Sequence, residues 1–500
     1  MSHQSEPKPP RLSTGVELEF AVIYVFHTRD ASSSEAEEKI IDDDLPQPLE
    51  IEFPKGVHRP NLHDIGQEAV QEAIIKTLRD AGFPTEEAEV SGQKTQEARQ
   101  LDPFRHCQVA SDTTIKVIGL EGFKARLPLR YAAIEIGLPV EWESPLSFEV
   151  VRYMINLLAS KFRIQINPTM GLHIHVGNGA AYMPFQWVKR ISMMSWAAER
   201  LLATLHPPTR SFCTHCMSIR GYSPLAHGVQ LEDHLEHNFE ERLLCERYIA
   251  RAVRFGEEST LWREAHIDKS TVEAFTRTRR SGCFESFIEN STLTTSVAIG
   301  ATPSQSEMIL PRVPDHMLSK PKRLNTFPRL KLPRYTEEDA EAMNRINGDV
   351  LSVADLAKDR GIWYGIEQIA RTESSCQIEG MLHTNDRANY SFLQCSCLNM
   401  GHTGWSKKKT IEWRQGAGTM DARWVATWLR IVTGVSRFAM HSPTDEFLRI
   451  IRRCDYAEEG GSYDVLDLLE DIGLVAEAAI AGERIKNYRR EWCQEYEDNS

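Results

Sequence analysis

The sequence predicts an α+β fold built on a mainly antiparallel sheet with flanking helices. Three segments, 15–20, 171–177 and 410–415, alternate apolar with polar residues, as strands with one buried face do. They lie far apart in the chain, and the segments between them do not follow the regular strand–helix alternation of a parallel sheet. We therefore expect one sheet whose strands come from distant parts of the sequence.

The elements of the first half follow from local patterns. Residues 1–13 are polar and proline-rich, so we expect them to be disordered, and the Ser- and acid-rich stretch 28–50 is expected to be a loop. Helices are expected where apolar residues recur at helical spacing, and Gly82 and Pro184 mark a helix end and a helix start. The expected strands are 15–27, 106–119, 131–142 and 171–177, and the expected helices are 62–81, 146–162, 184–205 and 231–253.

The second half begins with a change in composition. Ser, Thr and Pro, and then Lys and Arg with Pro, dominate 286–336, which predicts a partly disordered insertion. Beyond it we expect a helix at 337–358, a loop and strand at 383–397, a strand at 410–415, a helix at 421–440 and a helical segment at 463–495. The domain prediction is one unit at 14–440, interrupted at 286–336, followed by a helical extension at 441–500.

Composition limits the classes of partner. The 500 residues are 41% hydrophobic and carry a formal net charge of −13, without the cationic field that attracts nucleic acid or anionic membranes. No run of about 18 apolar residues predicts a membrane span, and the N-terminal segment lacks the apolar stretch of a secretory signal.

Cys213 and Cys216 could form half of a zinc site, but no second pair with finger spacing follows. The ten scattered cysteines fit a reducing compartment, so we expect a cytoplasmic protein.

Each of the three strand segments carries two functional side chains two residues apart. Residues i and i+2 of a strand share one face, roughly 6.5–7 Å apart. A single Glu-x-Glu is commonly a solvated face, but His-x-His between glycines is unusual there. If the strands join one sheet, carboxylates, imidazoles and a guanidinium share one side, which suits a divalent metal and a phosphate. The three pairs are Glu17 and Glu19, His173 and His175, and Glu412 and Arg414.

Further acidic residues extend this candidate site. Glu141 and Glu143 share a strand face just before Pro145, and they compete for one role as a ligand. Asp112 is either an oxygen ligand or a residue of an Asx turn. Arg414 is either a donor to a phosphoryl group or the partner of a structural ion pair with Glu412.

Clustered carboxylates and imidazoles suit Mg²⁺ or Mn²⁺ rather than a thiolate zinc site. Four or five carboxylates in one site repel each other, and two or three cations would relieve that repulsion. Such ions commonly bridge the phosphates of a nucleotide. The sequence has neither a Gly-x-x-x-x-Gly-Lys-Ser/Thr loop nor a Gly-x-Gly-x-x-Gly after a strand, so metals would have to hold the phosphates.

The order of these motifs resembles the amidoligase family, carboxylate–amine ligases with a glutamine synthetase-like fold that are related to glutamate–cysteine ligase. The resemblance spans about 15 to 440, with the interruption near 286–336. The motifs are Gly-x-Glu-x-Glu (15–19), Val-Glu-x-x-Ser-Pro (140–145), Gly-Leu-His-x-His-Val-Gly (171–177), His-Pro-Pro-Thr-Arg (206–210) and Thr-Ile-Glu-Trp-Arg-Gln followed by Gly-Thr-Met-Asp (410–421).

The resemblance implies a curved, mainly antiparallel sheet whose concave face holds divalent ions between ATP and a substrate carboxylate. It implies that Arg414 stabilises the transferring γ-phosphoryl group, and that Arg210 and, more weakly, Arg387 contact phosphate or the substrate carboxylate. One histidine would contact metal or phosphate, with His173 the first choice over His175. The implied metal ligands are Glu17, Glu19, Glu141, His173 and Glu412. The role of Asp112 stays open, because the sequence departs from the family pattern here. Cys107 stands where the family usually has Trp, and Asp112-Thr113-Thr114 stands in place of Asp-x-Ser.

The implied reaction has two steps. ATP phosphorylates a carboxylate to an acyl phosphate, and an amine then attacks to form an amide or isopeptide bond. Glu143 is the suggested base for the incoming ammonium. The partners are thus a carboxylate and an amine substrate, and the sequence specifies neither their size nor the oligomeric state.

Two other classes of protein are alternatives to a ligase. A metal-dependent hydrolase could use the same Glu and His residues to activate water, although no His-Glu-x-x-His motif supports it. A non-catalytic nucleotide- or partner-binding protein could retain the fold, but a site without function tends to lose its costly clustered acids.

Overall fold

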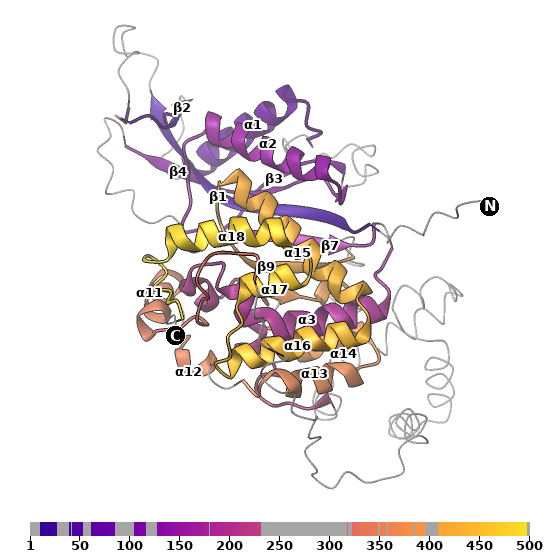
Figure 1. The fold of residues 1–500 in the computed structure, drawn as a ribbon. Coiled ribbons are helices and arrows are strands. Elements are labelled where there is room, and N and C mark those ends of the chain that lie inside the picture. Colours follow the sequence, from indigo (N-terminus) through magenta and orange to yellow (C-terminus); the bar gives the residue numbers. More distant parts are fainter. Residues whose placement is uncertain are drawn as a thin grey trace, which may run out of the picture.

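The computed structural model describes residues 11–27, 40–41, 43–53, 62–85, 105–116, 128–179, 181–231, 318, 323–348, 351–356, 359–384, 387–395 and 409–497. Within these ranges nine strands form one sheet, and helices lie against it (Figure 1). Every pairing between them is antiparallel except that of β1 with β2. The expected α+β class with a mainly antiparallel sheet is therefore confirmed.

The main path of the sheet runs β3-β4-β1-β7-β9-β8, and β2, β5 and β6 also pair with β1. The strands are β1 (Ser13–His27), β2 (Leu49–Glu52), β3 (Gln108–Ser111), β4 (Arg130–Gly137), β5 (Glu141–Trp142), β6 (Ile164–Gln165), β7 (Gly171–Gly177), β8 (Tyr390–Ser391) and β9 (Thr410–Ala417). The sheet is organised around β1, which pairs with five of the other strands.

The two faces of the sheet differ in chemistry. On β1, Val16, Leu18 and Phe20 are buried on one side, which we call the apolar face. Glu17 and Glu19 lie on the other side, which we call the chemical face. The alternation continues across the paired strands, so the side of each residue follows from its register with β1. Leu172, Ile174, Val176, Ile411 and Trp413 extend the apolar face, and all are buried.

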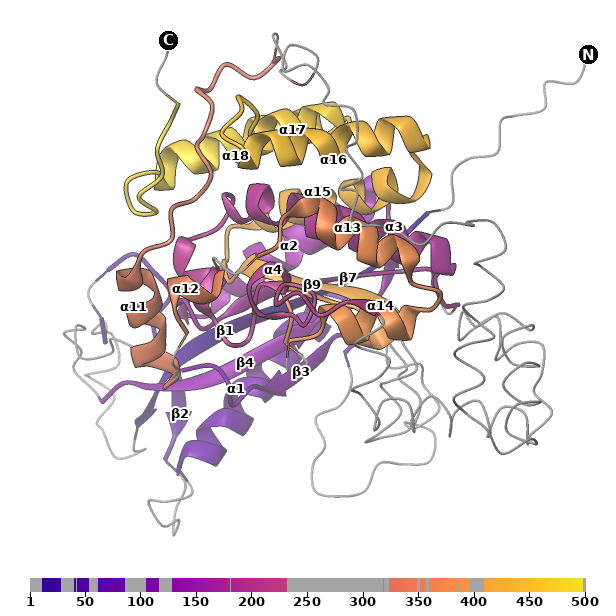
Figure 2. The same cartoon turned by 90° about the horizontal axis from the view of Figure 1, so that it is seen from below.

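Helices cover the apolar face. Helix α1 (Leu62–Asp80) contacts β4, and α15 (Ala422–His441) contacts β7. Helices α2 (Pro145–Lys161) and α3 (Phe185–Ala203) pack against α15. Figure 2 shows α15 and α3 between the sheet and the C-terminal helices, whereas α1 lies at the other end of the sheet beside β2 and β4. Polar caps fix two helix starts, because Ser144 accepts a hydrogen bond from Ser147 N at the start of α2, and Asp421 accepts from Trp424 N at the start of α15.

The C-terminal helices share the core of the main unit. They are α16 (Thr444–Glu458), α17 (Val465–Asp471) and α18 (Val475–Tyr488), and α16 packs on α3 while α18 packs on α15. Residues 323–336, the described end of the predicted insertion, form no helix but are fixed to α17. Arg329 Nε donates to Asp467 at 2.8 Å, and Arg323 Nη1 donates to Asp464 at 3.1 Å. The described part of the predicted extension, residues 441–497, is therefore continuous with the body of the protein.

Several elements differ from the sequence prediction. The predicted helix at 337–358 is two helices, α11 (Glu337–Asn347) and α12 (Val353–Leu356), because the backbone turns at Gly348 with φ of +82°. Two short helices, α13 (Ile362–Arg371) and α14 (Ser375–Leu382), were not expected. The predicted strand at 131–142 is broken into β4 and β5, with Leu138–Val140 outside both. The charged helix predicted at 231–253 lies, apart from Leu231, outside the described residues, and so does most of 286–322.

A buried ion-pair network joins three helical segments. Arg220, on the short helix α4 (Ile219–Tyr222), is 2% exposed and pairs with both Glu458 of α16 and Asp359. Arg200 of α3 also reaches Asp359 at 3.1 Å, but a third of its side chain is exposed. The two arginines contact the same carboxylate in different environments, so their removal should have different costs.

We expect Arg220→Met to lower the free energy of unfolding by about 3–5 kcal/mol, because Glu458 and Asp359 lose their buried partner. The matched Arg200→Met variant should cost at most about 1 kcal/mol, because solvent screens that pair. Urea denaturation monitored by circular dichroism measures both. If both variants lost the same free energy of unfolding, burial would not control the strength of these ion pairs.

Candidate functional site

Strand register brings three of the predicted ligands together on the chemical face. Glu17 of β1 lies opposite His173 of β7, and His175 lies opposite Glu412 of β9. His173 Nδ1 lies 3.6 Å from a Glu17 oxygen and 3.5 Å from a Glu412 oxygen. One ligand atom each of Glu17, His173 and Glu412 lies within 4.8 Å of the others. We call these three residues the His–Glu cluster.

The environment of His173 tests whether this cluster fits a cation. Its other ring nitrogen, Nε2, lies 3.4 Å from Glu19 Oε1, so three carboxylates face one imidazole. The side chain is almost fully buried, and neither ring nitrogen makes a hydrogen bond. A protonated His173 would neutralise only one of the three carboxylates. Divalent ions such as Mg²⁺ bind ligands at about 2.1 Å and space neighbouring ligands about 3 Å apart, so the arrangement fits such an ion.

His175 supports the cluster from the same face of β7. Its Nε2 lies 3.2 Å from Glu17 and its Nδ1 lies 2.9 Å from the hydroxyl of Thr410. Nε2 is 4.0 Å from Glu412, farther than the corresponding contact of His173. Of the two histidines, His173 therefore lies closer to Glu412 and nearer the centre of the cluster.

A second acidic cluster lies beside the first. Oxygens of Glu19, Asp112 and Glu135 lie within 4.8 Å of one another, and Glu19 is opposite Glu135 across β1 and β4. Asp112 Oδ1 also accepts the amide of Thr114 at 2.7 Å, so it forms the Asx turn as well as facing the cluster. Because Glu19 also faces His173, the two clusters adjoin each other.

Glu135 was not among the site residues expected from the sequence. The sequence pattern that could have pointed to Glu135 is a single acid within an otherwise apolar strand, Ala133-Ile134-Glu135-Ile136-Gly137. The predicted strand at 131–142 contained this residue, but only register with β1 reveals that Glu135 faces Glu19 rather than solvent.

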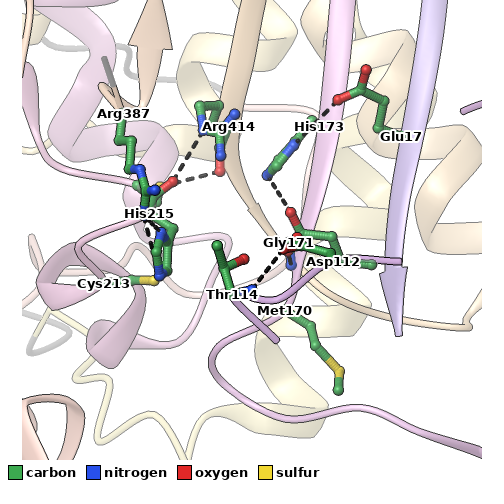
Figure 3. Close-up of polar contacts among 12 residues, drawn as sticks. Glu17, Asp112, Thr114, Met170, Gly171, His173, Cys213, His215, Arg387 and Arg414 are labelled. Atoms are coloured by element: carbon green, nitrogen blue, oxygen red, sulfur yellow. Dashed lines mark hydrogen bonds and ion pairs between the residues drawn. The ribbon is translucent and has the colours of Figure 1, made fainter. Parts of the chain in front are cut away.

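Arg414 of β9 connects the His–Glu cluster to the segment that carries His215. Its Nη1 donates to Glu412 at 2.6 Å. Its Nε donates to the carbonyl of His215 at 3.0 Å, as Figure 3 shows. The pairing of β7 with β9 is irregular at this point, between Leu172 and Ile174. Arg414 lies two residues from Glu412 and on the same face of the strand, as alternation requires, and it also reaches the segment that carries His215.

The charges of the cluster set the ionisation of Glu412. Burial alone would raise the pKa of this carboxyl, but the Arg414 guanidinium and the two histidines outweigh burial and lower the pKa. Conversely, Glu412 and Glu19 raise the pKa of Arg414 despite its own burial. Glu412 is therefore ionised at neutral pH, as a cation ligand must be.

The structure gives Arg210 a different role from the one expected. The side chain is buried, and its Nη1 and Nη2 donate to the carbonyls of Met170 and Arg414, at 3.2 and 2.9 Å. Both groups are thus used within the protein, rather than for a phosphate or a substrate carboxylate. The local fold explains this, because Arg210 lies in a 3₁₀ helix (Pro208–Phe212) that packs behind β9. Arg210 fixes the backbone on both sides of the site.

Arg387 lies at the edge of the site with a partner that the sequence did not suggest. Its exposed guanidinium donates to Nδ1 of His215, whose carbonyl binds Arg414 (Figure 3). Burial, and then the charge of Arg387, lower the pKa of His215 to about 4, so this ring is neutral at pH 7. The only sequence signal here was the pair Cys213 and Cys216 around it, and burial raises the pKa of the Cys216 thiol to about 11.

Glu141 and Glu143 do not join either cluster. Glu141 is exposed and lies opposite Thr14, an apolar-face position of β1. Glu143 forms an ion pair with Arg437 of α15, the helix over that same face. The register explains the difference, because Gly137 pairs with Glu17 but Glu141 pairs with Thr14, which leaves one extra residue between β4 and β5. That residue moves the acids of β5 to the opposite side of the sheet.

Comparison with known proteins adds no relative: no protein-family model matches the chain, and neither curated proteins nor solved structures give a significant match. Among the described helices, none combines the length and the apolar character needed to cross a membrane.

We expect Gly171→Ala to disrupt the site, because a Cβ there would lie 2.5 Å from His173 Nε2 and 2.6 Å from Arg210 Nη2. The Gly171 amide, which donates to Glu19 at 2.6 Å, would also shift. Calorimetric Mn²⁺ binding should weaken by at least about tenfold. Gly137→Ala is the matched control, since its Cβ meets Gln108 only at 3.8 Å. Unchanged Mn²⁺ binding in Gly171→Ala would argue that His173 takes no part in a cation site.

We expect Arg387→Met to raise the pKa of His215 from about 4, because the second-largest cause of its lowering is removed. The pKa should stay below 6.5, since burial, the largest cause, remains. NMR titration with ¹³C-labelled histidine measures this, and His215→Gln assigns the resonance. A His215 pKa that does not move in Arg387→Met would contradict the contact between the two side chains.

Proposed function

We propose that this protein is an ATP-dependent carboxylate–amine ligase of the amidoligase type, with a glutamine synthetase-like sheet. It would form an amide or isopeptide bond through an acyl phosphate. The observation that carries the proposal is that the His–Glu cluster, the second acidic cluster and the Arg414 guanidinium share one face of the sheet.

The ligand types support a nucleotide rather than a lone metal. Two adjoining clusters of carboxylates, one with an imidazole, suit two hard divalent cations such as Mg²⁺ or Mn²⁺. When bound, such ions would supply positive charge for the phosphates of ATP. The five carboxylates exceed what a single divalent ion neutralises, so the site is suited to a polyanion that arrives with its own cations.

The proposed reaction transfers a phosphoryl group and then an acyl group. In the first step, a substrate carboxylate oxygen bonds to the γ-phosphorus, and the bond to the β–γ bridging oxygen breaks to release ADP. In the second step, the amine nitrogen bonds to the acyl carbon, loses a proton, and the carbon–oxygen bond to phosphate breaks. The protein contributes mainly positioning and charge, since little covalent chemistry falls on it.

Among the described residues, Arg414 is the one best placed to act on the transferring group. Its Nε and Nη1 are held by His215 and Glu412, so its plane is fixed before any substrate enters. A preorganised guanidinium stabilises charge that develops in a transition state without further reorganisation. Glu143 is not the base of the second step in this scheme, because its carboxylate pairs with Arg437 over the other face.

The test separates the two faces of the sheet. We expect Glu17→Gln and Glu412→Gln to weaken Mg²⁺-dependent ATP binding by at least about tenfold, because each removes a charged ligand of the His–Glu cluster. Glu141→Gln, the control, should bind as wild type, since this acid lies opposite Thr14. Isothermal titration calorimetry with and without Mg²⁺ measures the affinities, followed by ADP release with mixtures of carboxylates and amines.

Two outcomes would count against the ligase. Folded wild-type protein that binds no Mg²⁺–ATP would contradict it, as would Glu141→Gln weakening binding as much as Glu17→Gln. ATP binding without ADP release on any substrate mixture would favour the non-catalytic alternative.

A further inference from the structure

A buried carboxylate behind the site has no part in the function proposed above. Glu199, on α3, is 4% exposed. Its Oε1 accepts from Asn389 Nδ2 at 2.9 Å, and its Oε2 accepts from the amide of Arg220 at 3.1 Å. Its backbone carbonyl accepts from Gln415 Nε2 at 3.1 Å. One residue of α3 thus contacts three separate segments, two of which adjoin Arg414 in sequence or in space.

Asn389 connects Glu199 to the site. This residue is buried, and both its backbone and its side-chain groups are hydrogen-bonded. Its carbonyl accepts the amide of Arg414 at 2.8 Å, its Oδ1 accepts the amide of Ile219 at 3.1 Å, and its amide donates to Met217 at 2.8 Å. The chain of contacts from Glu199 through Asn389 to Arg414 therefore contains only two hydrogen bonds.

The backbone of Arg414 needs this support. At this residue the pairing of β9 with β7 is irregular, so the β7 ladder does not fix the position of Arg414. On the other edge of β9, the bond from the Arg414 amide to Asn389 continues the register with β8, in which Tyr390 lies opposite Trp413. The Arg414 amide is thus held by Asn389 and its carbonyl by Arg210. Arg210 is anchored to the sheet through Met170, whereas Asn389 is anchored to the helical layer through Glu199.

We propose that Glu199 is a positioning residue, which holds Asn389 and thereby sets the place of Arg414 against Glu412. The role in catalysis rests on the proposed function, but the role in placing Arg414 does not. The sequence motifs of the site include neither Glu199 nor Asn389. Only the contacts of α3 with Asn389 and with Gln415 of β9 connect Glu199 to Arg414.

The ionisation of Glu199 adds a pH dependence to this arrangement. Burial raises the pKa of this carboxyl to about 7, although hydrogen bonds from Ser218 and Asn389 and the charge of Arg220 oppose burial. Glu199 is thus mostly protonated at pH 6 and ionised at pH 8. The ionised form is the stronger acceptor, so Asn389 should be held more firmly at pH 8. The other groups whose charges interact with Glu199 are Asp359, Cys216, Tyr335 and Tyr390.

The experiment compares wild type with Glu199→Gln by two readouts. Hydrogen–deuterium exchange of peptides across 410–417 reports the Arg414 amide, and calorimetry reports Mg²⁺–ATP affinity, both at pH 6 and pH 8. In wild type we expect about fivefold more protection of this amide at pH 8, after correction for intrinsic exchange. Glu199→Gln should lose that pH dependence, and its nucleotide affinity at pH 8 should fall by about fivefold to tenfold.

Two further variants separate positioning from a general loss of stability. Glu379→Gln is the matched control, because Glu379 is also a buried helical acid that binds the β8 segment, but at the amide of Phe392. It should leave both readouts as in wild type. Asn389→Ala removes the link itself, so adding Glu199→Gln to it should change protection and affinity little further.

The outcomes distinguish the two proposals. If wild type binds no Mg²⁺–ATP but Glu199→Gln still loosens the Arg414 amide, the ligase fails and the positioning role stands. If wild type binds Mg²⁺–ATP and Glu199→Gln matches it in affinity and protection at both pH values, the positioning role is overturned. The positioning role would also be overturned if the double variant showed the sum of the two single effects on protection and affinity. Glu199 and Asn389 would then act independently.

Discussion

The concentration of negative charge on the chemical face is the constraint to which the rest of the structure responds. Five carboxylates lie within two adjoining clusters, and like charges at such spacing repel strongly where water is largely excluded. The protein supplies part of the compensation from nearby groups: the Gly171 amide binds Glu19, and Arg414 binds Glu412. These groups reduce the repulsion without removing it, which leaves a site suited to cations. The pairing of β1 with β4 and β7 maintains this concentration because it fixes the register of every acid on those strands.

Behind the ligands, the supporting residues bind mainly backbone. Arg210 holds the carbonyls of Met170 and Arg414, and Asn389 holds the amide of Arg414. The point at which β7 and β9 pair irregularly is therefore fixed from the sheet side and from the helical side. Arg414 reaches Glu412 because residues two apart share a strand face, and its Nε reaches the carbonyl of His215. Where the ladder of β7 with β9 is irregular, hydrogen bonds of the Arg414 backbone with Arg210 and Asn389 hold this strand.

Much of the site could be predicted from sequence because the short-range rule of alternation holds within one uninterrupted strand. Glu17 with Glu19 and His173 with His175 fell on shared faces as expected. The rule failed for Glu141 and Glu143, where one extra residue between β4 and β5 reversed the facing of the strand. It also gave no account of His215, which lies in an irregular segment where side-chain direction has no period. The helix predicted at 337–358 failed for a similar local reason, since Gly348 adopts a left-handed conformation that ends α11.

By itself the sequence determined the α+β class, the two-sided character of the main strands and the residue types available for cation and phosphate chemistry. These depend on periodicity and composition, which are local properties of the chain. Only the tertiary structure decided which acids meet, that Glu135 faces Glu19, that Arg210 serves the backbone, and that Glu199 reaches Arg414 through Asn389. Those outcomes depend on strand register and on the packing of segments nearly 200 residues apart. Both are set by the burial of the whole apolar face, and no short stretch of sequence contains that information.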